Sequence, residues 1–249
     1  MKKAVMKKLT RTTIDINEAS ILVKIYEEPR KNVRASMTKN GAILRIPLGL
    51  TQERKNHFYG WFNDWLKSQL QNEKSKQLLL GKTYHHADTI NVYNRTYSLD
   101  IQFSNRKTHG AKLKKNTIYL SLNQNDVPAH IQKSIRQLIS RVVAQDCLPE
   151  FEKRVDYWND TYFQETINQI RFKNNQTNWG SCSSKRNLNF STRLLFATPE
   201  AIDYVIVHEL AHLKELNHSA KFWKIVSDVM PNYKVQEKWL DKNGHLCQF

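Results

Sequence analysis

Three histidines and a glutamate near the carboxyl end of the chain have the types and spacing of a hydrolytic metal site. His208 and His212 are four residues apart, so on a helix their imidazoles lie one turn apart on one face and can reach the same ion. Glu209 lies on the adjoining edge of that face, where its carboxylate can act as general base toward water activated by zinc. A chance match to this pattern is expected only about 0.015 times in a chain of this composition.

A catalytic zinc ion takes three protein ligands, and His218 is the best third ligand in the sequence. It follows His212 by six residues, so the chain must turn before its imidazole can come back to the ion. Asn217 tolerates the left-handed conformation that ends a helix, and Ser219 can cap the next helix. The rival ligands are four acidic or imidazole side chains: Glu215, Asp228, Glu237 and His245.

The helix that carries the first two histidines is expected to be buried. Thr198 suits its N-cap and Pro199 its first position. The turns that follow are apolar almost all round, with Ile202, Val205, Ile206, Val207, Leu210 and Leu213. Imidazole and carboxylate groups on a buried helix need partners, which favours a metal site over two core histidines.

A second segment, residues 177–184, has the small residues of a tight turn or bulge where the backbone approaches another group closely. A strand edge of this kind beside a zinc site can bind an extended peptide through main-chain hydrogen bonds. We expect Cys182 to be a packing residue rather than a nucleophile. The expected substrate-binding residues are Asn178, Trp179, Gly180 and Ser181, although Trp179 alone also suits an ordinary core position.

The expected fold is α+β, with a β-rich N-terminal portion over residues 1–125 and a zincin-like catalytic portion over residues 126–249; one integrated domain is the alternative. The first portion has short strands within 19–49, where Asn40-Gly41 is a hairpin signal, and within 83–122. The apolar spacing of residues 51–80 predicts one helix between them.

In the catalytic portion, a long helix that opens at Pro128 is expected to end or to be interrupted at Pro149. Residues 168–172 and 188–196 alternate like two strands of an antiparallel pair. This pair is expected to form a sheet beside the helix that carries the histidines.

The composition indicates a soluble, cytoplasmic protein with an anionic partner. Lys and Arg outnumber Asp and Glu by 39 to 23, and the surplus lies wholly upstream of residue 199. Such a charge attracts nucleic acid or phosphorylated small molecules; an ordinary solubilising surface is the alternative. The three cysteines are widely spaced, no apolar run is long enough to span a membrane, and no apolar stretch of a signal peptide follows the basic start.

Two motifs in the right order resemble the YgjP-like metallopeptidase family. The first runs from Asn178 through Trp179-Gly180-Ser181-Cys182 to Phe190, and the second runs from Pro199 through the histidines to Pro231. The resemblance implies a zincin-like domain with His208, His212 and His218 as zinc ligands and Glu209 as acid and base. More distant relatives are the SprT-like proteases, which act on proteins bound to DNA. The family usually has Arg where this chain has Asn178, so the substrate specificity is expected to differ.

The leading functional hypothesis is a metallopeptidase with one zinc ion. One alternative is hydrolysis of a phosphoanhydride, such as a nucleoside triphosphate, at the same metal, although no P-loop is present. Another is a nucleic-acid-associated protein with secondary protease activity, although no nucleic-acid-binding motif is present. The substrate is thus a peptide or an anionic small molecule. A non-catalytic zinc scaffold is disfavoured by the intact Glu209. Oxyanion stabilisation is left open among Tyr233, His245 and Arg193.

Overall fold

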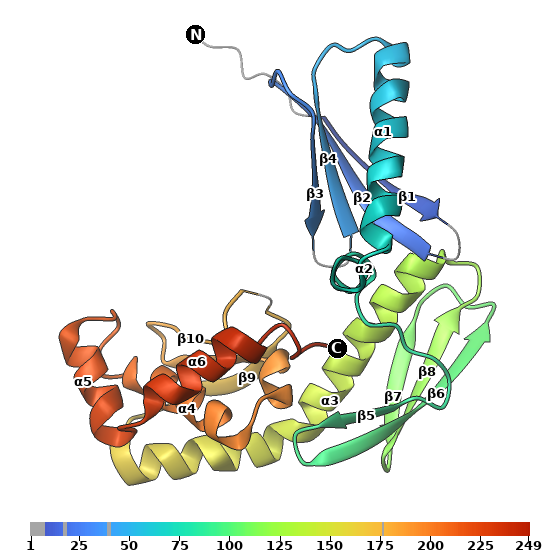
Figure 1. Ribbon diagram of the computed structural model, residues 1–249. Helices are drawn as coiled ribbons and strands as arrows, with labels where there is room; N and C mark the ends of the chain where they lie inside the picture. Colours follow the sequence, from blue (N-terminus) through green and yellow to red (C-terminus); the bar gives the residue numbers. More distant parts are fainter. Residues whose placement is uncertain (1–7, 17–18, 39–40, 176) are drawn as a thin grey trace. The chain divides into compact units, whose positions relative to one another are not determined.

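The computed structural model describes residues 8–16, 19–38, 41–175 and 177–249, and its fold is α+β (Figure 1). The contacts of the chain divide it into two compact units that are not the expected 1–125 and 126–249. We call them the N-terminal unit, Met1–Tyr84 with Asn123–Ile135, and the catalytic unit, His85–Leu122 with Arg136–Phe249.

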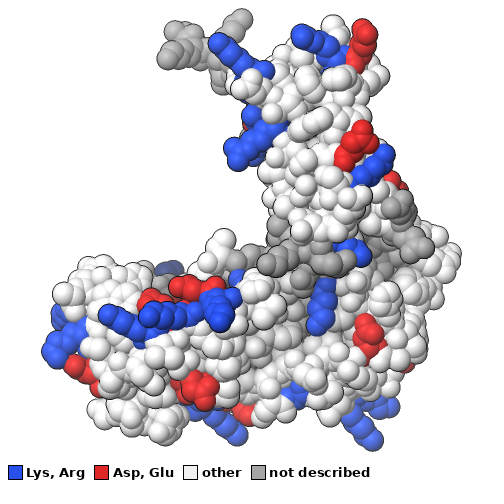
Figure 2. All heavy atoms as spheres, viewed as in Figure 1, with Lys and Arg blue, Asp and Glu red and all other residues white. Residues whose placement is uncertain are grey.

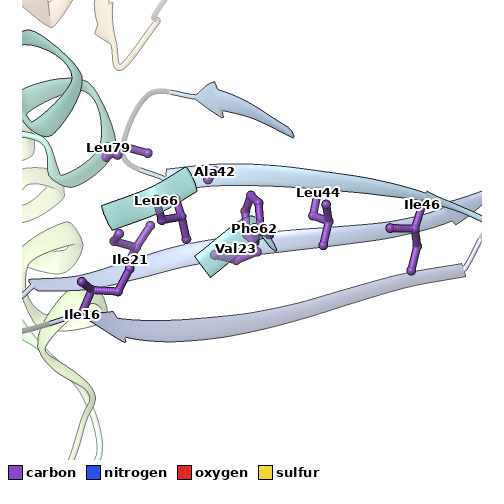
Figure 3. Packing of buried hydrophobic residues seen from close by; sticks show 9 residues of the cluster. All are labelled: Ile16, Ile21, Val23, Ala42, Leu44, Ile46, Phe62, Leu66 and Leu79. Atoms are coloured by element: carbon purple, nitrogen blue, oxygen red, sulfur yellow. The ribbon is translucent and has the colours of Figure 1, made fainter. Parts of the chain in front are cut away.

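The N-terminal unit is a four-stranded sheet whose apolar face is covered by two helices. The strands are β1 (Lys8–Ile16), β2 (Ala19–Glu28), β3 (Arg34–Thr38) and β4 (Gly41–Pro47), in the order β1-β2-β4-β3, and the helices are α1 (Gln52–Leu70) and α2 (Glu73–Leu80). Strand residues that face the helices form the core shown in Figure 3 together with Phe62 and Leu66 of α1 and Leu79 of α2. The strand residues are Ile16, Ile21, Val23, Ala42, Leu44 and Ile46.

Two details of this unit differ from the sequence prediction, and a third lies partly outside the described residues. β1 was not predicted, because most of its residues are polar and exposed. The single helix predicted over 51–80 is two helices, since the Asn72 side chain accepts a hydrogen bond from the Ser75 N–H at 3.1 Å and starts α2. Asn40 of the predicted hairpin lies outside the described residues, but the flanking strands pair antiparallel with Thr38 opposite Gly41.

The catalytic unit begins with a second sheet, as predicted within residues 83–122. Its strands are β5 (Thr89–Val92), β6 (Arg95–Ser104), β7 (Gly110–Lys114) and β8 (Thr117–Asn123), in the order β5-β6-β8-β7. The β5–β6 hairpin is fastened to the long helix α3 (Pro128–Trp158): the Tyr97 hydroxyl donates to Asp146 at 2.6 Å, and the Asn94 amide donates to Glu150 at 2.7 Å. These bonds explain why the second sheet groups with the carboxyl-terminal part of the chain.

Helix α3 continues through Pro149, so the expected break is wrong. Proline in a helix interior costs about 3 kcal/mol. The turns beyond it bury Phe151 and Val155 completely, and each large apolar side chain contributes roughly 1.5–3 kcal/mol when buried. The burial of these two side chains therefore offsets the cost of Pro149, and the helix continues.

A third, three-stranded sheet lies next to the helices of the catalytic unit. Its strands are β9 (Gln169–Lys173), β10 (Gly180–Cys182) and β11 (Asn187–Ser191), in the order β10-β11-β9. β9 and β11 are parallel, so the predicted antiparallel pair is wrong. The reason is that β10 lies between them in the sequence and forms the hairpin with β11 instead. After Ser191 the predicted strand gives way to the 3₁₀ helix η2 (Thr192–Phe196).

Three helices complete the catalytic unit: α4 (Pro199–Ala211), α5 (Ala220–Val229) and α6 (Tyr233–Asn243) (Figure 1). A short π-helix, η1 (Asn159–Phe163), follows α3. None of the described helices is both long and apolar enough to cross a membrane.

Basic side chains of the N-terminal unit are interspersed with acidic ones on the face shown in Figure 2. Several basic side chains of this unit form ion pairs: Lys55 with Glu27 at 2.8 Å, and both Arg30 and Arg45 with Glu28. These basic groups are therefore paired with acidic groups of the same unit.

Candidate metal centre

Helix α4 begins where the sequence predicts and is held firmly at that end. The Thr198 hydroxyl oxygen accepts from the Ala201 N–H at 3.4 Å, and Pro199 takes the first helical position. In the next turn, the Asp203 carboxylate accepts from the Arg154 guanidinium and, at 2.8 Å, from the Trp158 indole N–H. The helix is buried almost all round, which fixes the direction in which its histidines point.

The C-terminal end of α4 fixes the imidazole of His212. The helix ends at Ala211, and His212 is its C-cap. The Nδ1 atom of His212 lies 3.1 Å from the backbone carbonyl oxygen of Glu215. Because a carbonyl oxygen can only accept, Nδ1 carries the hydrogen and Nε2 retains a lone pair for a ligand.

His218 is brought back by a turn that the sequence predicts only in part. Asn217 is absent from the described residues with positive φ, so its expected left-handed conformation is wrong. Its side-chain oxygen instead accepts from the Ser219 N–H at 3.1 Å and closes the turn. Ser219 then caps α5 as predicted, by accepting from the Phe222 N–H.

The three histidines meet over one aromatic ring. Their ligand atoms all lie within 4.8 Å of one another, and the Nε2 atoms of His208 and His218 are 3.0 Å apart. The fully buried ring of Phe222 contacts the imidazoles of His208, His212 and His218 at centroid distances of 4.9, 4.5 and 4.8 Å. Trp223 stacks on His218. Two side chains of helix α5 therefore pack against the imidazoles.

The rival ligands lie outside this group. Among the described residues, no other three His, Cys, Asp or Glu side chains come as close together. Glu215 pairs with Lys221 at 3.5 Å, and Asp228 pairs with Lys224 at 3.0 Å.

Burial favours the neutral form of His208 and His212. Desolvation, together with the nearby His212 and His218, lowers the pKa of His208 to about 3, and desolvation also lowers the pKa of His212. The Nδ1 atom of His208 is buried with no hydrogen-bond partner among the described residues. A metal ion binds the neutral imidazole, so these groups are in the protonation state that a ligand needs.

Glu209 is the buried acid of the site. Its side chain is 4% exposed, its Oε2 atom has no partner among the described residues, and burial raises its pKa to about 8. Three imidazoles beside an unpartnered buried carboxyl group form a donor set that fits a divalent cation, whose positive charge would offset the desolvation of the carboxylate.

Strand β10 passes directly over Glu209. A Cβ atom at Gly180 would lie 2.4 Å from the Oε1 atom of Glu209, so no larger residue fits without displacing that carboxylate. Trp179 and Ser183 hydrogen-bond β11 through their backbones. By the alternation of an antiparallel pair, the backbone groups of Gly180 and Cys182 point away from β11, toward the free edge of the sheet.

A cavity of about 450 Å³ joins these features. All of the residues predicted for metal and substrate line it: Asn178, Trp179, Gly180, Ser181, His208, Glu209, His212 and His218. Four further residues line the cavity but were not predicted as site residues from the sequence: Tyr204, Val205, Leu216 and Leu240. The position of Tyr204 could have been predicted, because it precedes His208 by four residues and shares its helix face. The position of Leu240 could not, since this residue comes from a separate helix.

Cys182 also lines the cavity. Burial, followed by the nearby Glu209, raises the pKa of its thiol to about 11, which fits a packing residue better than a nucleophile. The three residues considered for oxyanion stabilisation, Tyr233, His245 and Arg193, are not among those lining the cavity.

Comparison with known proteins identifies the class. A family model described as the YgjP-like metallopeptidase domain matches residues 31–243. This match makes the protein a peptidase-like hydrolase of the metallopeptidase class. Because the match covers most of the chain, the protein belongs to the YgjP-like family.

Two solved structures are similar to part of the chain. The metallopeptidase zymogen abylysin of Pyrococcus abyssi is 23% identical, with a TM-score of 0.34, over 37% of this chain and 93% of its own. The metallopeptidase zymogen jannalysin of Methanocaldococcus jannaschii is 24% identical, with a TM-score of 0.33, over 39% of this chain and 96% of its own. No curated protein sequence matches the chain significantly.

Proposed function

We propose that this protein is a zinc-dependent peptidase in which His208, His212 and His218 hold one zinc ion and Glu209 is the general base. The observation that carries the proposal is the convergence of three imidazoles and one unpartnered buried carboxyl group in a single cavity. Nitrogen ligands of this number and kind suit zinc, with one position left for water or substrate.

The chemistry divides between the metal and the chain. When bound, a zinc ion would polarise the scissile carbonyl and make water acidic near neutral pH. Glu209 removes a proton from the attacking water, which forms the new C–O bond, and returns the proton to the nitrogen as the C–N bond breaks. Burial raises the pKa of Glu209 to about 8 in the metal-free chain, and the positive charge of a bound cation would favour the ionised form that accepts the proton.

The substrate is proposed to bind as an extended peptide along β10. The backbone N–H and C=O groups of Gly180 and Cys182 at the free edge can pair with a substrate strand. The cavity beside them is lined by apolar groups that suit an uncharged side chain: Trp179, Tyr204, Val205, Leu216 and Leu240. One edge acceptor is already occupied, since the Asn178 side chain donates to the Gly180 carbonyl at 2.9 Å.

The lining of the cavity favours a peptide over a phosphoanhydride. No Lys or Arg is among the described residues that line it. Triphosphates are bound by cations and by clustered backbone N–H groups. The basic surplus of the chain therefore lies elsewhere, and binding of nucleic acid remains a prediction from the sequence alone.

The substrate class is tested by incubating the purified, zinc-loaded protein with a peptide library and with a panel of nucleoside triphosphates. We expect cleavage of peptides with an apolar residue beside the scissile bond, and no release of phosphate or pyrophosphate. Nucleotide hydrolysis without peptide cleavage would replace the proposal by the phosphoanhydride alternative.

A further inference from the structure

Arg193 of η2 ties the C-terminal segment of the chain, residues 244–249, to the catalytic unit. Its Nε atom donates to the Cys247 carbonyl at 2.9 Å, and one terminal nitrogen donates to the Gly244 carbonyl at 2.5 Å. The segment is well packed: Cys247 and Phe249 are buried, and Phe249 contacts Phe196 of η2 edge to face.

The same arginine and the same segment hold Trp179. The guanidinium carbon lies 4.5 Å from the centroid of the Trp179 ring. Gly244 lies against the same indole, because a Cβ atom there would be 2.6 Å from the Cζ2 atom of Trp179. Gly244 has φ −59°, a conformation open to any residue. A Cβ atom there would also lie 2.5 Å from the Leu240 carbonyl oxygen, so the close approach of both this carbonyl and the indole makes glycine necessary.

Trp179 connects these contacts to the cavity. It lines the cavity, and its carbonyl accepts from the Ser191 N–H at 2.7 Å, which starts the pairing of β10 with β11. The next residue, Gly180, lies against the Glu209 carboxylate. A shift of the indole would therefore move both the wall of the cavity and the edge proposed to bind substrate.

We propose that Arg193 and residues 244–249 are positioning elements that hold Trp179 and, through it, the β10 edge in the conformation that binds substrate. The segment begins directly after residue 243, where the match to the family model ends. A stacked, bidentate arginine is well suited to this role, because its rigid planar group fixes two carbonyls and one ring at once. The proposal rests on the proposed role of β10 in binding peptide.

The test compares Arg193→Lys and Gly244→Ala with Gly60→Ala, a control in α1 whose Cβ would meet nothing within 4 Å. Lys keeps the charge but loses the planar fork. We expect KM for a cleaved peptide to rise about tenfold in Arg193→Lys, as for a lost hydrogen bond to a charged group. KM should also rise in Gly244→Ala, where the new Cβ meets the indole, while kcat and zinc content stay near wild type in both variants. The control should match wild type.

Hydrogen exchange supplies a readout that does not depend on activity. Amides of residues 178–183 should exchange faster in Arg193→Lys and Gly244→Ala than in wild type, whereas those of 205–212 should not. Unchanged exchange at 178–183 in folded variants would overturn the proposal, as would a fall in kcat with constant KM. If the wild type cleaves no peptide, the proposed function fails, and the exchange result still decides whether Arg193 positions β10.

Discussion

Burial of Glu209 ties the stability of the metal-free protein to pH. An unfolded glutamate ionises near pH 4.5, and burial raises the pKa to about 8 in the folded protein. Between these values the folded state holds a proton that the unfolded state has lost. Stability is therefore greatest below pH 4.5 for this group and is lost as the pH rises toward 8, by up to about 1.4 kcal/mol per pH unit.

Glu209→Gln removes this dependence. We measure the free energy of unfolding of both metal-free proteins by urea titration. From pH 5 to pH 8, we expect the free energy of unfolding of the variant to rise relative to that of the wild type. His208 has the opposite effect, since its pKa is lowered to about 3 and its contribution is lost as the pH falls below 6.5. This residue is common to both proteins, so its effect cancels. Parallel pH profiles would show that Glu209 is not desolvated.

The ligand assignment is tested by His218→Ala and Glu215→Ala. Loss of one imidazole from a three-histidine set should reduce zinc affinity strongly. The Glu215 side chain pairs with Lys221, and only its backbone carbonyl contacts His212, so that variant should keep its zinc. Metal content after dialysis decides between them. Zinc retained by the first variant and lost by the second would reverse the assignment.

For individual site residues, prediction from the sequence succeeded best where helical geometry relates one residue to another. The spacing of His208 and His212 placed both on one face, and Tyr204 follows from the same rule. Leu240 could not be predicted, because its proximity depends on how α6 packs against α4. The role of Asn217 was misjudged, since its side chain and its backbone offer two different ways to close the same turn.

Among the elements, strand β10 can be tested directly by a single substitution, Gly180→Ala. Gly180→Ala would place a Cβ atom 2.4 Å from the Glu209 Oε1 atom and must displace the carboxylate or the strand. A displacement on the order of 1 Å costs about a hundredfold in turnover. We expect this loss in peptide cleavage assays with the zinc content unchanged.

Gly60→Ala is the matched control, since its Cβ would meet nothing within 4 Å. Full activity of Gly180→Ala would mean that β10 does not determine the position of Glu209.

Element prediction succeeded where local chemistry decides the outcome. The Thr198 cap and Pro199 start α4 as expected, because the signals act within one turn. The direction of the predicted pairing of β9 with β11 was wrong, since alternation along a strand is the same in parallel and antiparallel sheets. Pro149 was misread, because burial of the following turns is a tertiary effect.

For the whole molecule, the sequence leaves two interpretations of the positive charge: binding of nucleic acid, or an ordinary solubilising surface. Residues 1–84 and 123–135 carry eighteen Lys and Arg against eight Asp and Glu, a net charge of +10. Nucleic acid binding by such a surface is electrostatic and weakens steeply with salt. We expect a shift of random-sequence DNA at low salt that disappears as salt is raised, as measured by electrophoresis. Absence of a shift at low salt would indicate that the charge is an ordinary solubilising surface.

Glu209 is proposed to move the proton in a zinc-dependent peptide hydrolysis. The decisive measurement is zinc content and peptide turnover of wild type and Glu209→Gln on the same preparations. We expect one zinc per chain in both proteins and a loss of turnover of about 10²–10⁴-fold in the variant, the usual contribution of a general acid–base group. If the variant retains its zinc and full activity, Glu209 is not the general base.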